Sequence, residues 1–324
     1  MPIPHAHFRS RATVASARAD SPTRAEHSPA AGIAFMCTGV FCLTVNDVFA
    51  KWLGQFYPVP EVAFFRMLFA LPLIVGVALA LGGPRALTTR RPLAHAGRGL
   101  LATLATLSFF LALTLLPLAE VSAIAFSAPV FVTLLAIPLL GERPGKTQWL
   151  ATLGGFAGIL LIARPGAAAF SLAALVPLVT AFAYGMLMLT ARMLGTRETI
   201  WATMFYATAV PLVLIAGLLP WFWETPALAH LPWFIGSGVF GGLAMTLITQ
   251  GFRIGVASVV APFDYTGLVW ATFFGWAIWG ELPAALSVLG GGIIALCGGY
   301  LAWSQTRVPR RAVRQEALHP PRGD

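Results

Sequence analysis

The stretch AEVSAIAFSAPVFVTLLAIPLLGERP, residues 119–144, is an apolar run closed by a Gly-Glu-x-Pro turn. The run is long enough to cross a bilayer as a helix, which takes about 20 apolar residues. The turn recurs 139 positions later at residues 280–283, behind a second apolar run at 256–279. Because the order of apolar segments around the two turns also agrees, we interpret the chain as a duplication.

Composition places the chain in a lipid bilayer. Hydrophobic residues make up 58% of the 324 residues and charged residues only 10%, whereas about a quarter of a soluble domain is charged. The mean hydropathy of +0.79 agrees with a polytopic membrane protein. The net charge of +9 does not indicate nucleic-acid binding, because the basic residues fall in tails and short loops. The three cysteines lie inside apolar runs, so no disulfide framework is expected.

The apolar segments predict an all-α protein with ten transmembrane helices, because unbroken apolar runs of this length cross membranes as helices. They cover residues 31–53, 61–82, 98–116, 119–140, 147–163, 171–191, 200–219, 231–252, 257–279 and 285–303. We expect two five-helix repeats, 31–163 and 171–303, followed by a cytoplasmic tail at 304–324. For residues 1–30, a disordered cytoplasmic tail is preferred to a transit peptide.

The distribution of Lys and Arg predicts the orientation. With a cytoplasmic N-terminus, the inside tails and loops hold 18 of the 21 basic residues, and the exceptions are Lys51, Arg66 and Arg164. Basic residues accumulate on the cytoplasmic side, so both termini are predicted to be cytoplasmic. A five-span repeat must then insert in opposite senses. Secondary transporters with such inverted repeats bind their substrates near the midplane, between the two halves.

Three strings carry a family resemblance: PEVAFFRMLFALP at 60–72, LAEVSAIAFSAPVFVTLLAIPLLGE at 118–142 and GELP at 280–283. They are similar to EamA-type members of the drug/metabolite transporter superfamily, over about residues 31–303. The resemblance implies a ten-helix carrier of small organic molecules in the bacterial cytoplasmic (inner) membrane, working by alternating access and without a cofactor. Whether two copies form a homodimer is left open.

The same resemblance bears on the substrate. The family includes exporters of amino acids and metabolites, and importers such as S-adenosylmethionine carriers. The strings NDVFAKWL at 46–53 and PVPEVAFFR at 58–66 resemble the S-adenosylmethionine subgroup. An amino-acid-like or nucleoside-like substrate is therefore implied, with S-adenosylmethionine as one candidate. The alternative within the family is a metabolite or drug exporter.

Functions of other classes are less favoured. An intramembrane enzyme needs clustered metal ligands or a nucleophile near a histidine, but the six histidines fall outside the expected spans. No Walker-type Gly-x-x-x-x-Gly-Lys sequence is present, so ATP is not the direct driver. A channel stays open on composition alone, and the inverted repeat favours a carrier.

Charged residues within the spans are the first candidates for a site, because each costs about 2.5–3.5 kcal/mol at a span centre on insertion scales. Asp47 and Arg66 are expected at similar depth on consecutive antiparallel helices. In one interpretation, Arg66 holds an anionic group of the substrate and Asp47 tunes it. In the other, Asp47 forms a structural ion pair with Arg66, or with Lys51 at i,i+4 spacing.

Asp264 is the sharpest single candidate. Its nearest basic neighbour in sequence is Arg253, and its counterpart in the first repeat is Ala125, so this carboxylate breaks the symmetry of the duplication. A carboxylate without a local partner suits proton exchange or capture of a cationic substrate. The alternative is an ion pair with Arg66 across the bundle.

Weaker candidates are polar or aromatic side chains within the spans: Asn46, Gln250, Tyr265, Trp270 and Phe126. Each could line a cavity between the halves. Polar residues in spans also bond neighbouring helices, and aromatic residues also face lipid, so both uses stay open for these five.

Overall fold

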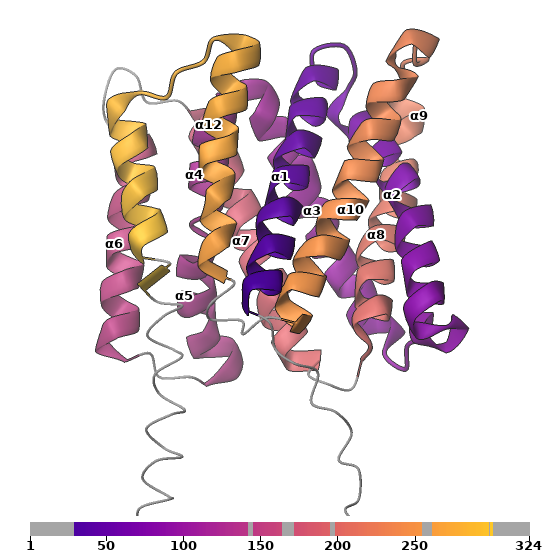
Figure 1. Ribbon diagram of the computed structural model, residues 1–324, viewed down its shortest axis with the longest axis horizontal. Coiled ribbons are helices and arrows are strands. Elements are labelled where there is room, and N and C mark those ends of the chain that lie inside the picture. Colours follow the sequence, from indigo (N-terminus) through magenta and orange to yellow (C-terminus); the bar gives the residue numbers. More distant parts are fainter. Residues whose placement is uncertain are drawn as a thin grey trace, which may run out of the picture.

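The computed structural model describes residues 29–141, 145–163, 172–194, 198–254, 261–297 and 299–300. Within these ranges the regular elements are helices and no strand is present. The long helices stand side by side along a common direction (Figure 1). Almost all of the expected N-terminal tail, and the whole C-terminal tail, lie outside the described residues.

The first half of the chain contains six α-helices and a short 3-10 helix. They are α1 (Pro29–Leu53), α2 (Val59–Gly82), η1 (Pro84–Leu87), α3 (Pro92–Leu115), α4 (Leu118–Ala125), α5 (Ala128–Leu140) and α6 (Lys146–Ala163). Helices α4 and α5 together occupy the segment that the sequence predicts as a single span.

The described residues of the second half follow the same order. They form η2 (Leu172–Ala174), α7 (Leu175–Leu194), α8 (Ile200–Ala216), α9 (Leu219–Phe222), η4 (Leu228–His230), α10 (Leu231–Ile254), η5 (Ala261–Tyr265) and α12 (Thr266–Trp279). A further apolar helix runs from Ala285 to Cys297.

Five helical segments within the described ranges are long and apolar enough to cross a membrane. They are Ala30–Leu53, Val59–Gly82, Pro92–Leu115, Leu118–Leu139 and Leu228–Gly251. Shorter apolar helices occupy Thr152–Ile162, Leu172–Leu187, Ile200–Ala216 and Ala285–Cys297. The helices begin and end near the apolar segments of the sequence, except where proline residues or short turns divide them.

The helix boundaries recur at the spacing of the duplicated turn. Helix α3 runs over residues 92–115 and α10 over residues 231–254, so both ends are displaced by the same 139 positions. Helices α5 and α12 end at counterpart residues as well. The glycines that follow them, Gly141 and Gly280, both have φ of 66°, a left-handed conformation that glycine adopts without a steric penalty.

The interruption between α4 and α5 has a local cause. Pro129 has no backbone N–H and its ring disfavours a helical carbonyl four residues earlier, at Ala125. Helix α4 ends at Ala125, and Ser127 closes the turn by donating from its Oγ to the carbonyl oxygen of Ile124 at 2.6 Å. A run of apolar residues therefore predicts the span but not its division into two helices.

Packing pairs join the two halves. Helix α1 packs extensively on α10, and its counterpart α7 packs on α3, the counterpart of α10. Helix α2 contacts its counterpart α8, and α4 contacts α12, the counterpart of α5. Figure 1 shows α1 between α12 and α10, at the centre of the bundle.

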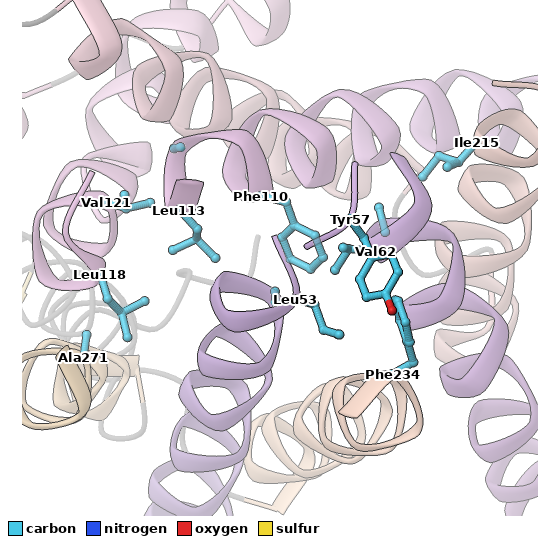
Figure 2. Packing of buried hydrophobic residues seen from close by; sticks show 13 residues of the cluster. Leu53, Tyr57, Val62, Phe110, Leu113, Leu118, Val121, Ile215, Phe234 and Ala271 are labelled. Atoms are coloured by element: carbon cyan, nitrogen blue, oxygen red, sulfur yellow. The ribbon is translucent and has the colours of Figure 1, made fainter. Parts of the chain in front are cut away.

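The largest apolar cluster lies toward the end of the bundle where α1, α3 and α12 finish, which is the upper end in Figure 1. Leu53, Leu113, Leu118 and Val121 are no more than 1% exposed in this cluster. Leu118 lies against Ala271 of α12 on one side of the cluster (Figure 2). The upper end is thus closely packed across α1, α3, α4 and α12.

One histidine departs from the sequence-based expectation. His95 was expected in a loop, but α3 begins at Pro92 and includes it. Its ring is 1% exposed and packs on Tyr206, with ring centroids 4.9 Å apart. Proline is well tolerated in the first turn of a helix, so Pro92 starts α3 earlier than the apolar pattern indicates.

Candidate functional site

Two helix interruptions meet between the halves of the bundle. Phe126 lies between α4 and α5, and its counterpart Tyr265 ends η5, just before α12. The two rings contact each other, with centroids 5.3 Å apart. Irregular backbone at membrane depth is tolerated only where it is buried in protein or lines a water-filled cavity.

The two interruptions are closed in the same way. Ser127 Oγ donates to the carbonyl oxygen of Ile124 at 2.6 Å, and Thr266 Oγ1 donates to the carbonyl oxygen of Phe263 at 2.7 Å. These donors and acceptors are counterparts in the duplication. Both halves therefore place a short hydroxyl-stabilised turn where their rings touch.

Asp264 lies in η5, next to Tyr265, and not within a continuous helix as the sequence predicts. It is half-buried and lies close enough to the hydroxyl groups of Tyr184 and Tyr265 for electrostatic interaction. Tyr184 belongs to α7, yet its side chain is 45% exposed. The N-terminal end of α12 beside Asp264 favours negative charge through the helix dipole.

Aromatic side chains continue this region along α12. Trp270 packs edge-on against Phe41 of α1, with ring centroids 5.0 Å apart. Phe274 lies 6.0 Å from Phe41 by the same measure. The predicted aromatic residues thus make two separate ring contacts, Phe126 with Tyr265 beside Asp264, and Trp270 with Phe41 further along α12.

The second predicted group is a hydrogen-bonded network centred on Asn46. Arg66 Nε donates to Asn46 Oδ1 at 3.0 Å, and Ser237 Oγ donates to the same oxygen at 3.0 Å. Asn46 Nδ2 in turn donates to Asp47 Oδ1 at 2.9 Å. Helices α1, α2 and α10 are joined by these bonds, and Asn46 is 1% exposed.

Arg66 and Asp47 are therefore linked through Asn46. Within the described ranges, the ion pairs shorter than 4.0 Å join Lys51 to Glu281 and His95 to Glu198, so Asp47 makes none with Arg66 or Lys51. The guanidinium carbon of Arg66 lies 5.6 Å from the centroid of the Phe110 ring. A direct Asp47–Arg66 or Asp47–Lys51 pair, expected as a structural alternative, is not formed in this structure.

Gly241 of α10 leaves the space that this network occupies. A Cβ atom at position 241 would lie 3.1 Å from Arg66 Nε and 3.1 Å from Asn46 Oδ1. Such contacts are tighter than van der Waals contact for a carbon atom. The close approach of α10 thus positions the polar end of Arg66 against α1.

Comparison with known proteins identifies the kind of molecule that carries this site. Residues 30–164 match the EamA-like transporter family. Residues 30–164 carry an EamA-like transporter domain. This confirms the resemblance seen in the sequence, and the names of the family and of the relatives indicate a membrane transporter rather than an enzyme.

Several relatives match most of the chain. The chain is 28% identical to an S-adenosylmethionine uptake transporter of Rickettsia prowazekii (strain Madrid E), over 85% of this chain and 94% of that protein. It is 28% identical to a riboflavin transporter of Vibrio cholerae, over 88% and 97%. It is 29% identical to the pseudopaline exporter CntI of Pseudomonas aeruginosa, over 85% and 96%.

A solved crystal structure shares the fold of this chain. The TM-score is 0.60 at 20% sequence identity, and the match covers 88% of this chain and 99% of the other. At this identity the likeness concerns the fold alone. The family match over residues 30–164, the names of the relatives and the long apolar helices together support a membrane transporter of small molecules.

The structure separates the predicted residues into two groups and leaves one apart. Asn46, Asp47 and Arg66 form the network, while Asp264, Tyr265 and Trp270 lie along η5 and α12, with Phe126 against Tyr265. Gln250 lies near the end of α10 and is half-buried.

The sequence does not single out Ser237 as a member of the network. The residue 139 positions earlier is Arg98, which also bonds a neighbouring helix. Arg98 Nη1 donates to the carbonyl oxygen of Leu187 at 2.8 Å and to Thr190 Oγ1 at 2.9 Å, both on α7. Ser237 bonds α1 in the equivalent way. A residue-by-residue alignment of the two halves is the signal that could have found it.

Proposed function

We propose that the chain is a secondary active transporter that carries a small organic metabolite across the cytoplasmic membrane by alternating access. The observation that carries this proposal is the meeting of two helix interruptions at Phe126 and Tyr265, beside Asp264. Discontinuous helices that meet between two repeats form the substrate sites of many secondary transporters. Membrane transporters are the class to which the family and the relatives belong.

An inverted repeat of two five-helix halves explains the alternation. The proposal is supported by the common 139-residue displacement of α3 and α10. It is also supported by the packing, because α1 contacts α10 and their counterparts α7 and α3 contact each other. An odd number of spans in each half reverses the second half in the membrane. The lower end of the bundle in Figure 1, where α1 begins, is then cytoplasmic, and the upper end faces outward.

The proposed orientation predicts the side on which the C-terminus lies. A reporter enzyme that is active only outside the cytoplasmic membrane, fused after Arg307, should give no activity. The same reporter inserted in the α8–α10 connection, after Glu224, should be active, because that connection lies at the upper end of the bundle. Strong activity of the fusion after Arg307 would contradict the ten-span topology.

The chemistry of the site favours a substrate with both a cationic and an amino-acid-like part. Asp264, next to Tyr265 and within electrostatic range of Tyr184, suits a positively charged group, which binds carboxylates and aromatic rings. Arg66 and Asp47 offer opposite charges for a carboxylate and an amine. S-adenosylmethionine carries a sulfonium, an amino-acid group and an aromatic base, and four relatives are named as its uptake transporters.

Ligand-dependent stabilisation of the purified protein tests this substrate class. S-adenosylmethionine should raise the unfolding temperature, since a ligand at 100 times its Kd stabilises the folded state by about 2.7 kcal/mol. S-adenosylhomocysteine, which lacks the sulfonium charge, is the matched control and should stabilise less. Preferential stabilisation by riboflavin would assign the chain to a different substrate class.

Export of a metabolite is the second candidate function. The 29% identity to the pseudopaline exporter CntI, over 96% of that protein, favours it specifically. Import and export use the same alternating site and differ in the direction of the driving gradient, so flux measurements separate them.

A further inference from the structure

An ion pair outside the proposed substrate site ties three elements together at the upper end of the bundle. Lys51, in the last turn of α1, donates from Nζ to Glu281 Oε1 and Oε2 at 2.7 and 2.8 Å. It also donates to the carbonyl oxygen of Leu116, at the end of α3, at 3.1 Å. Glu281 Oε2 accepts a hydrogen bond from the backbone N–H of Leu118, at the start of α4, at 3.3 Å.

The bonding capacity of Lys51 is used within the protein. An ammonium group has three N–H donors, and Nζ has three oxygen acceptors within 3.1 Å. The ring of Trp279 lies over the same ammonium, with its centroid at 5.1 Å. Lys51 therefore offers no spare donor to a ligand, and the pair acts on the fold.

The pair lines a cavity of about 330 Å³, together with Gln55, Thr114 and Trp279. The apolar cluster at the same end of the bundle contains Leu53, Leu118 and Ala271, each with no exposed surface. Asp47 lies one helical turn below Lys51 on α1, at a rise of about 6 Å.

The duplication does not supply an equivalent pair at the opposite end. The turn that places Glu281 recurs with Glu142, which lies outside the described residues, but the counterpart of Lys51 is the uncharged Thr190. The counterpart positions 142 and 190 therefore cannot form the same ion pair at the opposite end. The pair of Lys51 and Glu281 adds stability to the arrangement in which the upper end is closed.

We propose that Lys51 and Glu281 form the latch of an outer gate, which must separate before the substrate site opens to the outside. This inference rests on the alternating access proposed above. Glu281 belongs to the second half of the chain, whereas Lys51, Leu116 and Leu118 belong to the first, so the latch spans the two halves that move relative to each other.

Thiol accessibility at Ala271 tests the latch without any substrate. Ala271 has no exposed surface and belongs to the apolar cluster that contains Leu53 and Leu118, and cysteine is a small replacement for alanine. The background is the full chain with Cys37, Cys42 and Cys297 changed to alanine and Ala271→Cys introduced. A membrane-impermeant maleimide is added outside intact cells, and the labelling rate is compared in this background with Lys51→Met, Glu281→Gln and Lys51→Arg.

Lys51→Met and Glu281→Gln should each raise the labelling rate roughly tenfold or more, because removing one partner of a buried ion pair destabilises the closed state that contains it. Lys51→Arg keeps the charge and should stay within about twofold of the background. Thr114→Cys, exposed in the outer cavity, is the control reporter and should label equally in all variants.

A folding defect is detected separately, by size-exclusion profile and by the Thr114→Cys signal. Glu281→Gln preserves the shape and the acceptor oxygen of the side chain, so it keeps the test valid if Lys51→Met fails to fold. Unchanged labelling at position 271 in folded Glu281→Gln would overturn the latch. That result would leave the proposed transport activity standing, since labelling requires no substrate. Accelerated labelling without flux would show that the pair closes the upper end of the bundle, and would refute the transport proposal.

Discussion

Replacing Asp264 with asparagine is expected to abolish proton-driven accumulation of substrate while substrate exchange across the membrane continues. Asp264 lies in η5 at the contact of the two halves, next to Tyr265 and within electrostatic range of Tyr184. Asparagine matches the neutral carboxyl group in shape but cannot exchange a proton. Removing the titrating step should therefore uncouple transport from the proton gradient without unfolding the site.

The measurement compares accumulation under an imposed pH gradient with counterflow in the same purified mutant. Accumulation should fall at least tenfold, a change of about 1.4 kcal/mol in coupling free energy, and counterflow should stay within a few-fold of the unmodified protein. Glu224→Gln, which removes an exposed carboxylate at the upper end, is the control and should leave both rates unchanged. Normal accumulation by Asp264→Asn would end the assignment of this residue to coupling.

Removing Arg66 is expected to be the most damaging single change to the network. Arg66→Ala takes away the cation nearest to Asp47 and leaves Asn46 Oδ1 with Ser237 as its donor. Loss of one partner from a buried charged group costs about 3–5 kcal/mol. Transport should fall by two orders of magnitude or more, at about 1.4 kcal/mol per factor of ten.

A double-mutant cycle separates coupling from additive damage. Asp47→Ala and Arg66→Ala together should be milder than the sum of the single changes, by about 0.5–3 kcal/mol in the free energy of unfolding. Because Asn46 links the two residues, the interaction energy should shrink when the cycle is repeated with Asn46→Ala. Strict additivity in the first cycle would remove the Asp47–Arg66 coupling from the account. A second cycle with Asp47→Ala and Lys51→Met is the matched control. Its two changes should be close to additive, since Lys51 bonds Glu281 and not Asp47.

The sequence predicts where helices occur better than how each is divided. Helix α10 begins where the apolar segment begins, at Leu231. Pro129 within the apolar run indicates an interruption of this span, since proline removes a hydrogen-bond donor and disfavours the preceding helical turn, and the structure places the break after Ala125. Hydropathy alone gives a single span there. The same limitation led to Asp264 being placed inside a helix, whereas it lies in η5.

The site illustrates the difference between proximity along a helix and proximity across the bundle. The i,i+4 spacing of Asp47 and Lys51 indicates a pair, but Lys51 reaches a carboxylate 230 positions away in sequence. Asn46 was a minor candidate and proves to be the centre of the network, with partners on α2 and α10. Spacing along a helix reports only local neighbours, and which side chains meet across the bundle depends on tertiary packing.

The proposed carrier function is tested most directly by flux in proteoliposomes. Purified protein is reconstituted, a pH gradient is imposed, and uptake and efflux of radiolabelled S-adenosylmethionine are followed beside empty liposomes. Saturable, gradient-dependent accumulation above equilibrium is the predicted result. A substrate that only equilibrates, at a rate too large for turnover-limited transport, would contradict the carrier and indicate a channel.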